Sequence, residues 1–180
     1  KKYTPSRGTG AFGDRVSVDV CGPFPTAVHT GFRYVIGFAD RETKMTACYF
    51  SKDKTAESVK DAIKTFIADH VHLMPSGRIK ELHTDNGGEF DEIFDVLQKK
   101  YGIRRIRTSA YHPQANGIIE RLHGYLRGVL VAMGAAQQTE WHKLLPVAAF
   151  AYRATPVSRM GFTPFPLMPG REPVIPGELR

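Results

Sequence analysis

The chain has 180 residues, of which 42% are apolar and 24% charged; these values are ordinary for a globular protein and exclude a disordered one. A chain of this length can bury a core without disulfides or a structural metal, and its longest apolar stretch, near 128–136, is far shorter than the roughly 18 residues of a membrane span. The 25 Lys and Arg against 18 Asp and Glu give a net charge of +7, which favours a polyanionic partner such as nucleic acid, with charge kept for solubility alone as the alternative.

The first part of the chain has the pattern of β-strands. Apolar and polar residues alternate over 16–20, as in a strand with one apolar face. The stretch 32–39 is apolar on both faces, which is typical of a central strand. A turn at 40–43 leads into 45–50, so the second and third strands are predicted to form a hairpin.

The remaining elements alternate between helical and extended patterns. They are a helix over 56–71, a strand over 79–84, a helix over 90–101, a strand over 103–108, a helix over 119–133 and a helix over about 140–154. This order predicts an α/β fold with a mixed five-stranded sheet flanked by helices. Cys21 and Cys48 form no Cys-x-x-Cys pair and are expected to be free thiols.

Both ends of the chain lack periodicity and are expected to lie outside the folded core. Residues 1–12 are predicted to be a linker and 13–160 the core. Residues 161–180 are rich in proline, which excludes a long helix there and predicts a C-terminal extension.

Three carboxylates lie at positions of the predicted elements where a negative charge points to a specific role. Asp19 lies inside the first strand, where a carboxylate near the core is costly unless it is paired or binds a metal. Asp85 follows the strand 79–84, and Glu120 lies in the first turns of the helix 119–133. Two strand ends and a helix start can converge on one point, and oxygen-only ligands there favour Mg²⁺ or Mn²⁺ over zinc.

Each carboxylate also has a simpler explanation. The run Asp85-Asn86-Gly87-Gly88 is a good turn sequence, and Glu120 is placed to favour the positive end of a helix dipole. Asp19 can accept hydrogen bonds at a sheet edge. Asp40 is expected to be a residue of the hairpin turn.

Three segments carry these carboxylates: Val-Asp-Val-Cys-Gly-Pro-Phe at 18–24, His-Thr-Asp-Asn-Gly-Gly-Glu-Phe at 83–90 and Ser-Ala-Tyr-His-Pro-Gln-Ala-Asn-Gly-Ile-Ile-Glu at 109–120. They resemble, in order, the first, second and third acidic motifs of the integrases of retroviruses and LTR retrotransposons, with gypsy-like elements most similar. The resemblance continues to Gly-Phe-Thr-Pro-Phe at 161–165 and thus covers nearly the whole chain.

The resemblance implies a ribonuclease-H-like core in which Asp19, Asp85 and Glu120 are catalytic and hold two Mg²⁺ or Mn²⁺ ions. It implies a polynucleotidyl transferase and endonuclease that trims the 3′ ends of the element's DNA and then joins them to target DNA. The expected partners are double-stranded DNA, as element ends and as target, and further copies of the chain in a homodimer or larger oligomer, with no membrane involved. It also implies an upstream zinc-binding domain before the linker, a downstream DNA-binding domain, and action in the nucleus after a cytoplasmic particle.

The helix 119–133 is predicted to present Glu120, His123, Gly124 and Arg127 on one face, opposite its apolar stripe. By position His123 and Arg127 match sites of that family that touch the element's DNA end. Gly124 would let DNA approach closely. The alternative is an ordinary solvated helix face.

The loop before that helix is the second candidate DNA contact. An aromatic side chain and amides can stack on and hydrogen-bond frayed bases. The residues concerned are Tyr111, His112, Gln114 and Asn116. The alternative is that this loop only builds a turn and caps the helix. Five cations within 99–107 are a candidate phosphate track, or serve solubility.

Two further functions compete with an active integrase. Another nuclease of the same fold, such as a ribonuclease H or a cut-and-paste transposase, would share the acidic cluster but neither the His-Pro-Gln-x-Asn-Gly-x-x-Glu loop nor the tail at 161–165. A domesticated, inactive integrase would serve as a DNA-binding or scaffold module. The presence of all three carboxylates argues against such decay.

Overall fold

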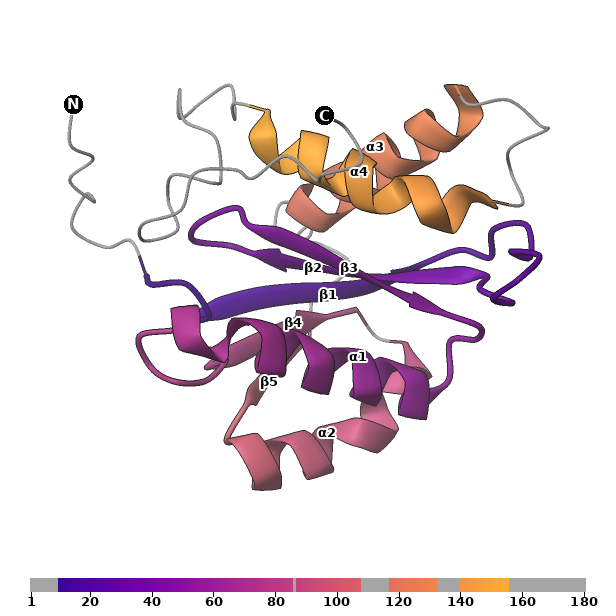
Figure 1. Cartoon of the computed structure of the whole chain (residues 1–180). Helices are drawn as coiled ribbons and strands as arrows, with labels where there is room; N and C mark the ends of the chain where they lie inside the picture. Colours follow the sequence, from indigo (N-terminus) through magenta and orange to yellow (C-terminus); the bar gives the residue numbers. More distant parts are fainter. Residues whose placement is uncertain (1–9, 86, 108–116, 133–139, 156–180) are drawn as a thin grey trace, which may run out of the picture.

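A mixed sheet of five strands lies between two layers of helices in the computed structural model, which describes residues 10–85, 87–107, 117–132 and 140–155 (Figure 1). The strands are β1 (Arg15–Cys21), β2 (Tyr34–Asp40), β3 (Thr46–Ser51), β4 (Glu81–Thr84) and β5 (Arg104–Arg107), in the order β3-β2-β1-β4-β5. β1, β2 and β3 are antiparallel neighbours, whereas β4 and β5 run parallel to β1. The predicted mixed five-stranded sheet and its hairpin are confirmed.

The helices cover the sheet in pairs, with α1 and α2 on one face and α3 and α4 on the other (Figure 1). They are α1 (Ala56–His70), a short 3₁₀ helix (Val71–Leu73), α2 (Gly88–Tyr101), α3 (Gly117–Ala132) and α4 (Trp141–Ala154). Local signals explain their ends: Thr55 caps α1 by accepting the Ser58 N–H, and Gly102 ends α2 with a φ of 63°. The predicted helices are confirmed within a few residues at each end.

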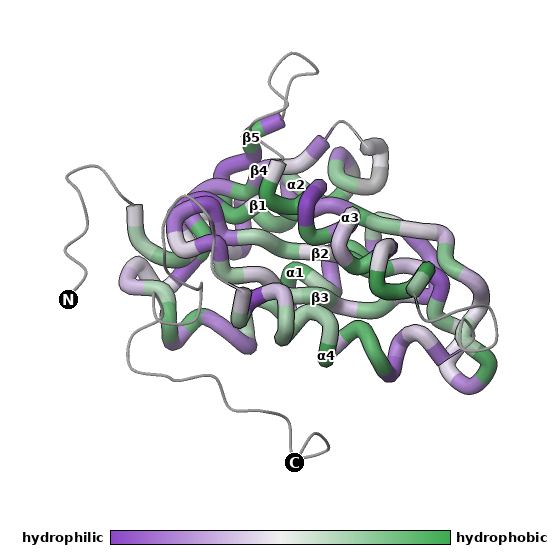
Figure 2. Tube along the Cα trace, turned by 90° about the horizontal axis from the view of Figure 1, so that it is seen from above, coloured by the Kyte–Doolittle hydropathy of each residue, from purple (hydrophilic) through white to green (hydrophobic). Residues whose placement is uncertain are grey.

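Two apolar cores lie on the two faces of the sheet. Between the sheet and α1 and α2, the buried side chains include Val16, Val18, Phe38, Phe66 and Leu97. Between the sheet and α3 and α4, they include Cys21, Val35, Ile119, Leu122 and Trp141. Figure 2, seen from above, shows apolar residues along the strands and a largely hydrophilic β5.

The alternation in β1 decides which residues face α3. Val16 and Val18 point into the core under α1 and α2. Ser17 is paired with Ala39, which packs in the core under α3 and α4, so Ser17 and Asp19 face that side. The predicted polar face of β1 is therefore turned towards the α3–α4 layer.

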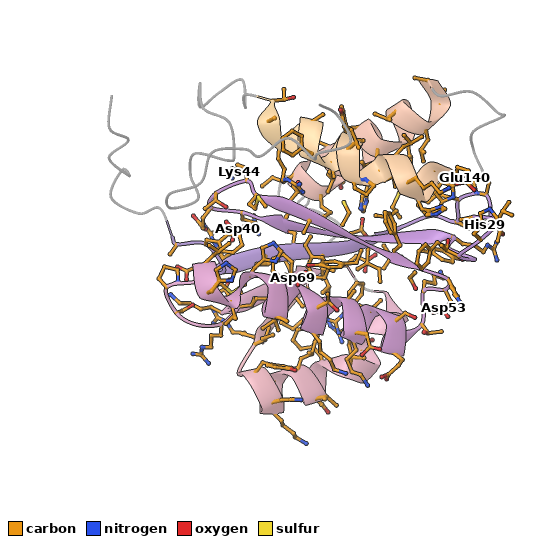
Figure 3. The ribbon with its side chains drawn as sticks, viewed as in Figure 1. His29, Asp40, Lys44, Asp53, Asp69 and Glu140 are labelled. Carbon is orange, nitrogen blue, oxygen red and sulfur yellow. The ribbon has the colours of Figure 1, made fainter. Side chains whose placement is uncertain are left out.

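Asp40 closes the β2–β3 hairpin, as predicted. Its Oδ1 accepts the backbone N–H groups of Glu42 (3.1 Å) and Thr43 (2.7 Å), and its Oδ2 accepts that of Gly13 at 2.9 Å. Asp40 and Lys44 lie at the same end of the sheet in Figure 3. Burial raises the pKa of the Asp40 carboxyl, against the opposing effect of these donors.

Other predictions concern the chain ends, the thiols and the membrane. Cys21 and Cys48 are free thiols, as expected. Within the described ranges, no helix combines the length and the apolar character of a membrane span. Most of the predicted linker 1–12 and all of the extension 161–180 lie outside the described residues, so the domain boundaries stay predictions.

Candidate active site

Asp19 lies in β1 with its side chain 30% exposed and directed towards α3. Its Oδ1 accepts the N–H of Val20 at 2.8 Å, and its Oδ2 lies 3.3 Å from Nδ1 of His123. On β2 its register partner is Gly37. Asp19 therefore stands between a backbone donor and a ring nitrogen, with part of its carboxylate open to solvent.

Asp85 follows the last residue of β4 and is exposed. The parallel register pairs Val16 with Leu82 and Ser17 with His83, where the pairing ends; Asp85 comes two residues after His83, as Asp19 comes two residues after Ser17. Its Oδ1 accepts the Gly87 N–H at 2.9 Å, which is the turn that the sequence offered as the simpler explanation. Asp85 therefore belongs to a turn directly after β4, the strand next to β1.

Glu120 is exposed in the first turn of α3. The preceding residue, Ile119, is buried against the sheet, and its Cδ1 would lie 3.1 Å from a Cβ added to Gly37. Since Gly37 pairs with Asp19, α3 crosses the sheet next to Asp19, and Glu120 starts from that crossing.

The three carboxylates thus come from neighbouring elements, but their side chains are not gathered into a ligand set. Within residues 10–85, 87–107, 117–132 and 140–155, no three His, Cys, Asp or Glu side chains are grouped closely enough to hold a metal ion. The donors themselves fit a hard divalent cation, because all are carboxylate oxygens and the side chains of Asp85 and Glu120 are exposed and not packed in a core.

His123 does not lie on the solvent face where the sequence was expected to place it. It is only 4% exposed and belongs to the packed side of α3, together with Ile119, Leu122 and Leu126. The spacing contains the signal that was missed: 119, 122, 123 and 126 form an i, i+3, i+4, i+7 stripe in which the histidine takes an apolar position.

Gly124 and Arg127 are exposed on α3, as predicted. A Cβ added to Gly124 would meet no atom within 4 Å, so packing within the chain does not require glycine there. Arg127 borders a hollow of about 260 Å³ that is otherwise lined by apolar side chains, among them Phe24, Leu130 and Trp141. The candidate loop residues Tyr111, His112, Gln114 and Asn116 lie outside the described residues.

The basic segment 99–107 is not an open row of cations. The Arg105 side chain is 9% exposed; it donates to Thr84 Oγ1 at 3.0 Å and to the Asp85 carbonyl at 3.3 Å, and it pairs with Asp91. Arg104 pairs with Glu81, and Arg107 pairs with Asp91 at 2.8 Å. The sequence offered Arg105 as part of a phosphate track or as a charge for solubility; in the structure its side chain supports the end of β4.

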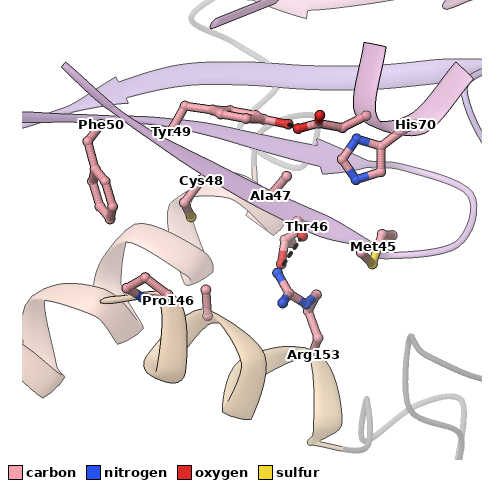
Figure 4. A pocket seen from close by; sticks show the side chains of 11 residues that line it. Met45, Thr46, Ala47, Cys48, Tyr49, Phe50, His70, Pro146 and Arg153 are labelled. Atoms are coloured by element: carbon pink, nitrogen blue, oxygen red, sulfur yellow. Dashed lines mark hydrogen bonds between the residues drawn. The ribbon is translucent and has the colours of Figure 1, made fainter. Parts of the chain in front are cut away.

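A second hollow, of about 300 Å³, runs along β3 at the far edge of the sheet from Asp85 (Figure 4). Arg153 of α4 donates there to the Thr46 carbonyl at 3.1 Å, and the Tyr49 hydroxyl donates to Asp69 at 2.8 Å. Its lining includes none of the predicted site residues.

The known proteins that this chain is similar to are Pol polyproteins of viruses and of transposons. The chain is 27% identical over 158 residues to the Pro-Pol polyprotein of feline foamy virus and 28% identical over 165 residues to the Retrovirus-related Pol polyprotein from transposon 412 of Drosophila melanogaster. These matches cover 87% and 91% of this chain but 13% of each polyprotein. Viral and transposon relatives are about equally similar, so the gypsy-like assignment is not confirmed.

Solved structures with a similar fold include a retroviral integrase core. A structure of the HTLV-2 integrase catalytic core domain in complex with magnesium, in a trimeric form, is similar with a TM-score of 0.64 at 15% identity, covering 88% of this chain and 97% of that one. The ribonuclease-H-like fold class is thereby confirmed. Residues 12–113, more than half of the chain, match the family described as Integrase core domain. The chain therefore belongs to the integrase core domain family found in the Pol polyproteins of retroviruses and retrotransposons.

Proposed function

We propose that the chain is the catalytic core of an integrase that trims the 3′ ends of retroelement DNA and transfers them into target DNA. The observation that carries this proposal is the parallel pairing of β1, which contains Asp19, with β4, which Asp85 directly follows. α3 brings Glu120 from its crossing at Gly37, the register partner of Asp19. The three carboxylates thus belong to one strand, the residue after its neighbouring strand, and one helix, and in this proposal they turn towards one point when metal ions bind.

In this proposal Asp19, Asp85 and Glu120 hold the divalent ions, Mg²⁺ or Mn²⁺, for which their oxygen donors are suited. Two such ions, when bound, activate the attacking oxygen and stabilise the leaving one. The chain's own part is to bring the three carboxylates to one place and to fix their directions. The Gly87 N–H and the Val20 N–H each hold one carboxylate oxygen for this purpose.

DNA binding is proposed for the exposed face of α3 and for the preceding loop. Arg127 supplies a cation two turns beyond Glu120, and Gly124 leaves the helix surface open between them. The net charge of +7 supports a polyanionic partner. We include Tyr111, His112, Gln114 and Asn116 as contacts to frayed bases, action in the nucleus, and homo-oligomer formation like that of the trimeric HTLV-2 core.

The test is Mn²⁺-dependent strand joining on a branched DNA that mimics the integrated product. Asp85→Asn keeps the size of the side chain and removes a negative oxygen, so the rate should fall at least about 100-fold, as when a group that stabilises transition-state charge is lost. The matched control is Asp95→Asn on the exposed side of α2, which should keep the parent rate. Equal activity of parent and Asp85→Asn, or an inactive parent with intact fold, would contradict the proposal and favour a scaffold module.

A further inference from the structure

Three residues from three elements are neighbours in the candidate active site. Asp19 in β1 pairs with Gly37 in β2, and the ring of His123 in α3 lies over that glycine. A Cβ added to Gly37 would lie 2.6 Å from His123 Nε2, closer than side chains approach one another. The ring therefore occupies the space that a side chain at position 37 would need.

The burial of His123 is costly for the fold. The residue is 4% exposed, and its Nε2 is buried with no hydrogen-bond partner among the described residues. A polar atom buried in this way destabilises the folded state, and an apolar side chain would fill the same stripe of α3 without that cost. Packing alone thus does not account for a histidine here.

The contact of the other ring nitrogen, Nδ1, explains why position 123 is a histidine. Nδ1 lies 3.3 Å from Oδ2 of Asp19, while Oδ1 of the same carboxylate accepts the Val20 N–H. When Nδ1 carries the ring hydrogen, it adds a donor at ion-pair distance from Oδ2 to the hydrogen bond that Oδ1 accepts, and rotation of the carboxylate is restricted. Groups that orient a ligand carboxylate in this manner tune metal binding.

We propose that His123 is a positioning residue, seated on Gly37, that holds the Asp19 carboxylate in the orientation needed to bind a divalent cation. This inference rests on the proposed function, since it takes Asp19 as a metal ligand. It replaces the expectation that His123 touches DNA, because a side chain this buried presents no surface to a duplex.

Two substitutions separate positioning from packing. Nδ1 of histidine and Nδ2 of asparagine are both bonded to Cγ, so His123→Asn keeps a donor at the same branch point. His123→Leu fills the site with a carbon there and donates nothing. A third, Gly37→Ala, leaves the histidine in place and displaces its ring.

The experiment measures Mn²⁺ binding to the whole chain by electron paramagnetic resonance, with urea unfolding to confirm the fold. His123→Leu should be as stable as the parent or more so, yet bind Mn²⁺ about 10- to 100-fold more weakly. Gly37→Ala should lose a similar factor, and His123→Asn should retain most of the affinity. In strand joining, His123→Leu should lower the rate at saturating DNA without raising the KM for DNA.

Failure of this inference differs from failure of the proposed function. Equal Mn²⁺ affinity in the parent and in a folded His123→Leu variant would overturn the positioning role, and so would a parent that shows no Mn²⁺ site sensitive to Asp19→Asn. A parent that binds Mn²⁺ through Asp19, loses that binding in His123→Leu and yet joins no DNA would support the positioning role and contradict the integrase activity.

Discussion

Arg105 in β5 donates from its Nε to the hydroxyl of Thr84, the last residue of β4, at 3.0 Å. The same guanidinium reaches the carbonyl of Asp85 at 3.3 Å, pairs with Asp91 and lies 5.1 Å from the centre of the Phe94 ring. The Arg105 side chain thus connects β5, the end of β4 and α2, directly next to Asp85, one of the candidate metal ligands.

We expect Arg105→Lys to destabilise the fold and to disturb Asp85. An ammonium group cannot make these contacts at the same time; where the buried Thr84 hydroxyl loses its donor, the cost is about 1–3 kcal/mol. Arg104→Lys is the control, because Arg104 is 70% exposed in its pair with Glu81. Urea unfolding and strand joining measure the two effects. If both variants behave alike, Arg105 has no special role at the end of β4.

His70 should make stability depend on pH. Its ring stacks on Phe66 with centroids 4.6 Å apart, and burial lowers the pKa of His70 below its ordinary value of 6.5. The unfolded chain therefore takes up a proton at a higher pH than the folded chain does. The stability contributed by neutral His70 is complete above pH 6.5 and is lost as the pH falls towards the lowered pKa.

The measurement compares the parent with His70→Gln by urea unfolding between pH 7.5 and 5. At pH 7.5 the variant should be less stable by about 0.5–1.5 kcal/mol, because the ring stack is gone. That difference should shrink as the pH falls, since only the parent carries the titrating ring. A difference that stays constant over this range would show that His70 takes no part in the pH dependence.

Gly124 lies in open space on the exposed face of α3, and so does Gly128 one turn later. Alanine at either position should stabilise the helix by about 1 kcal/mol. If DNA passes between Glu120 and Arg127 as proposed, Gly124→Ala should also raise the KM for branched DNA, and Gly128→Ala should do so less. A stabilised Gly124→Ala variant with unchanged KM would remove this position from the DNA path.

The two thiols should resist alkylation in the folded protein. Burial raises the pKa of Cys48 to about 12 and also raises that of Cys21, and the thiolate is the reacting form. At pH 8 iodoacetamide should therefore label neither residue until urea is added, which mass spectrometry can follow. Labelling of the native chain at the rate of an unfolded peptide would contradict the raised pKa values of the buried Cys21 and the half-buried Cys48.

Local patterns in the sequence were sufficient for the elements and for much of the candidate site. The period-two and period-3.6 spacings predict the five strands and the four long helices because each residue's face follows from its own position in the element. The turn at Asp40 is equally local, since its carboxylate bonds the N–H groups of residues two and three positions later. The same local patterns are sufficient to place Asp19 in a strand, Asp85 after a strand and Glu120 at the start of a helix.

Contacts between distant residues decided the rest. The stripe of positions 119, 122, 123 and 126 indicates that His123 can lie on the packed face of α3, but that its ring has room there depends on Gly37 of β2, and no pattern within α3 reveals a gap in another element. Arg105 is held by Thr84 and Asp91 rather than by solvent, because the parallel pairing of β5 with β4 brings them together. Periodicity determines which side chains share a face; which face is covered, and by what, depends on packing between segments that the chain brings together only when it folds.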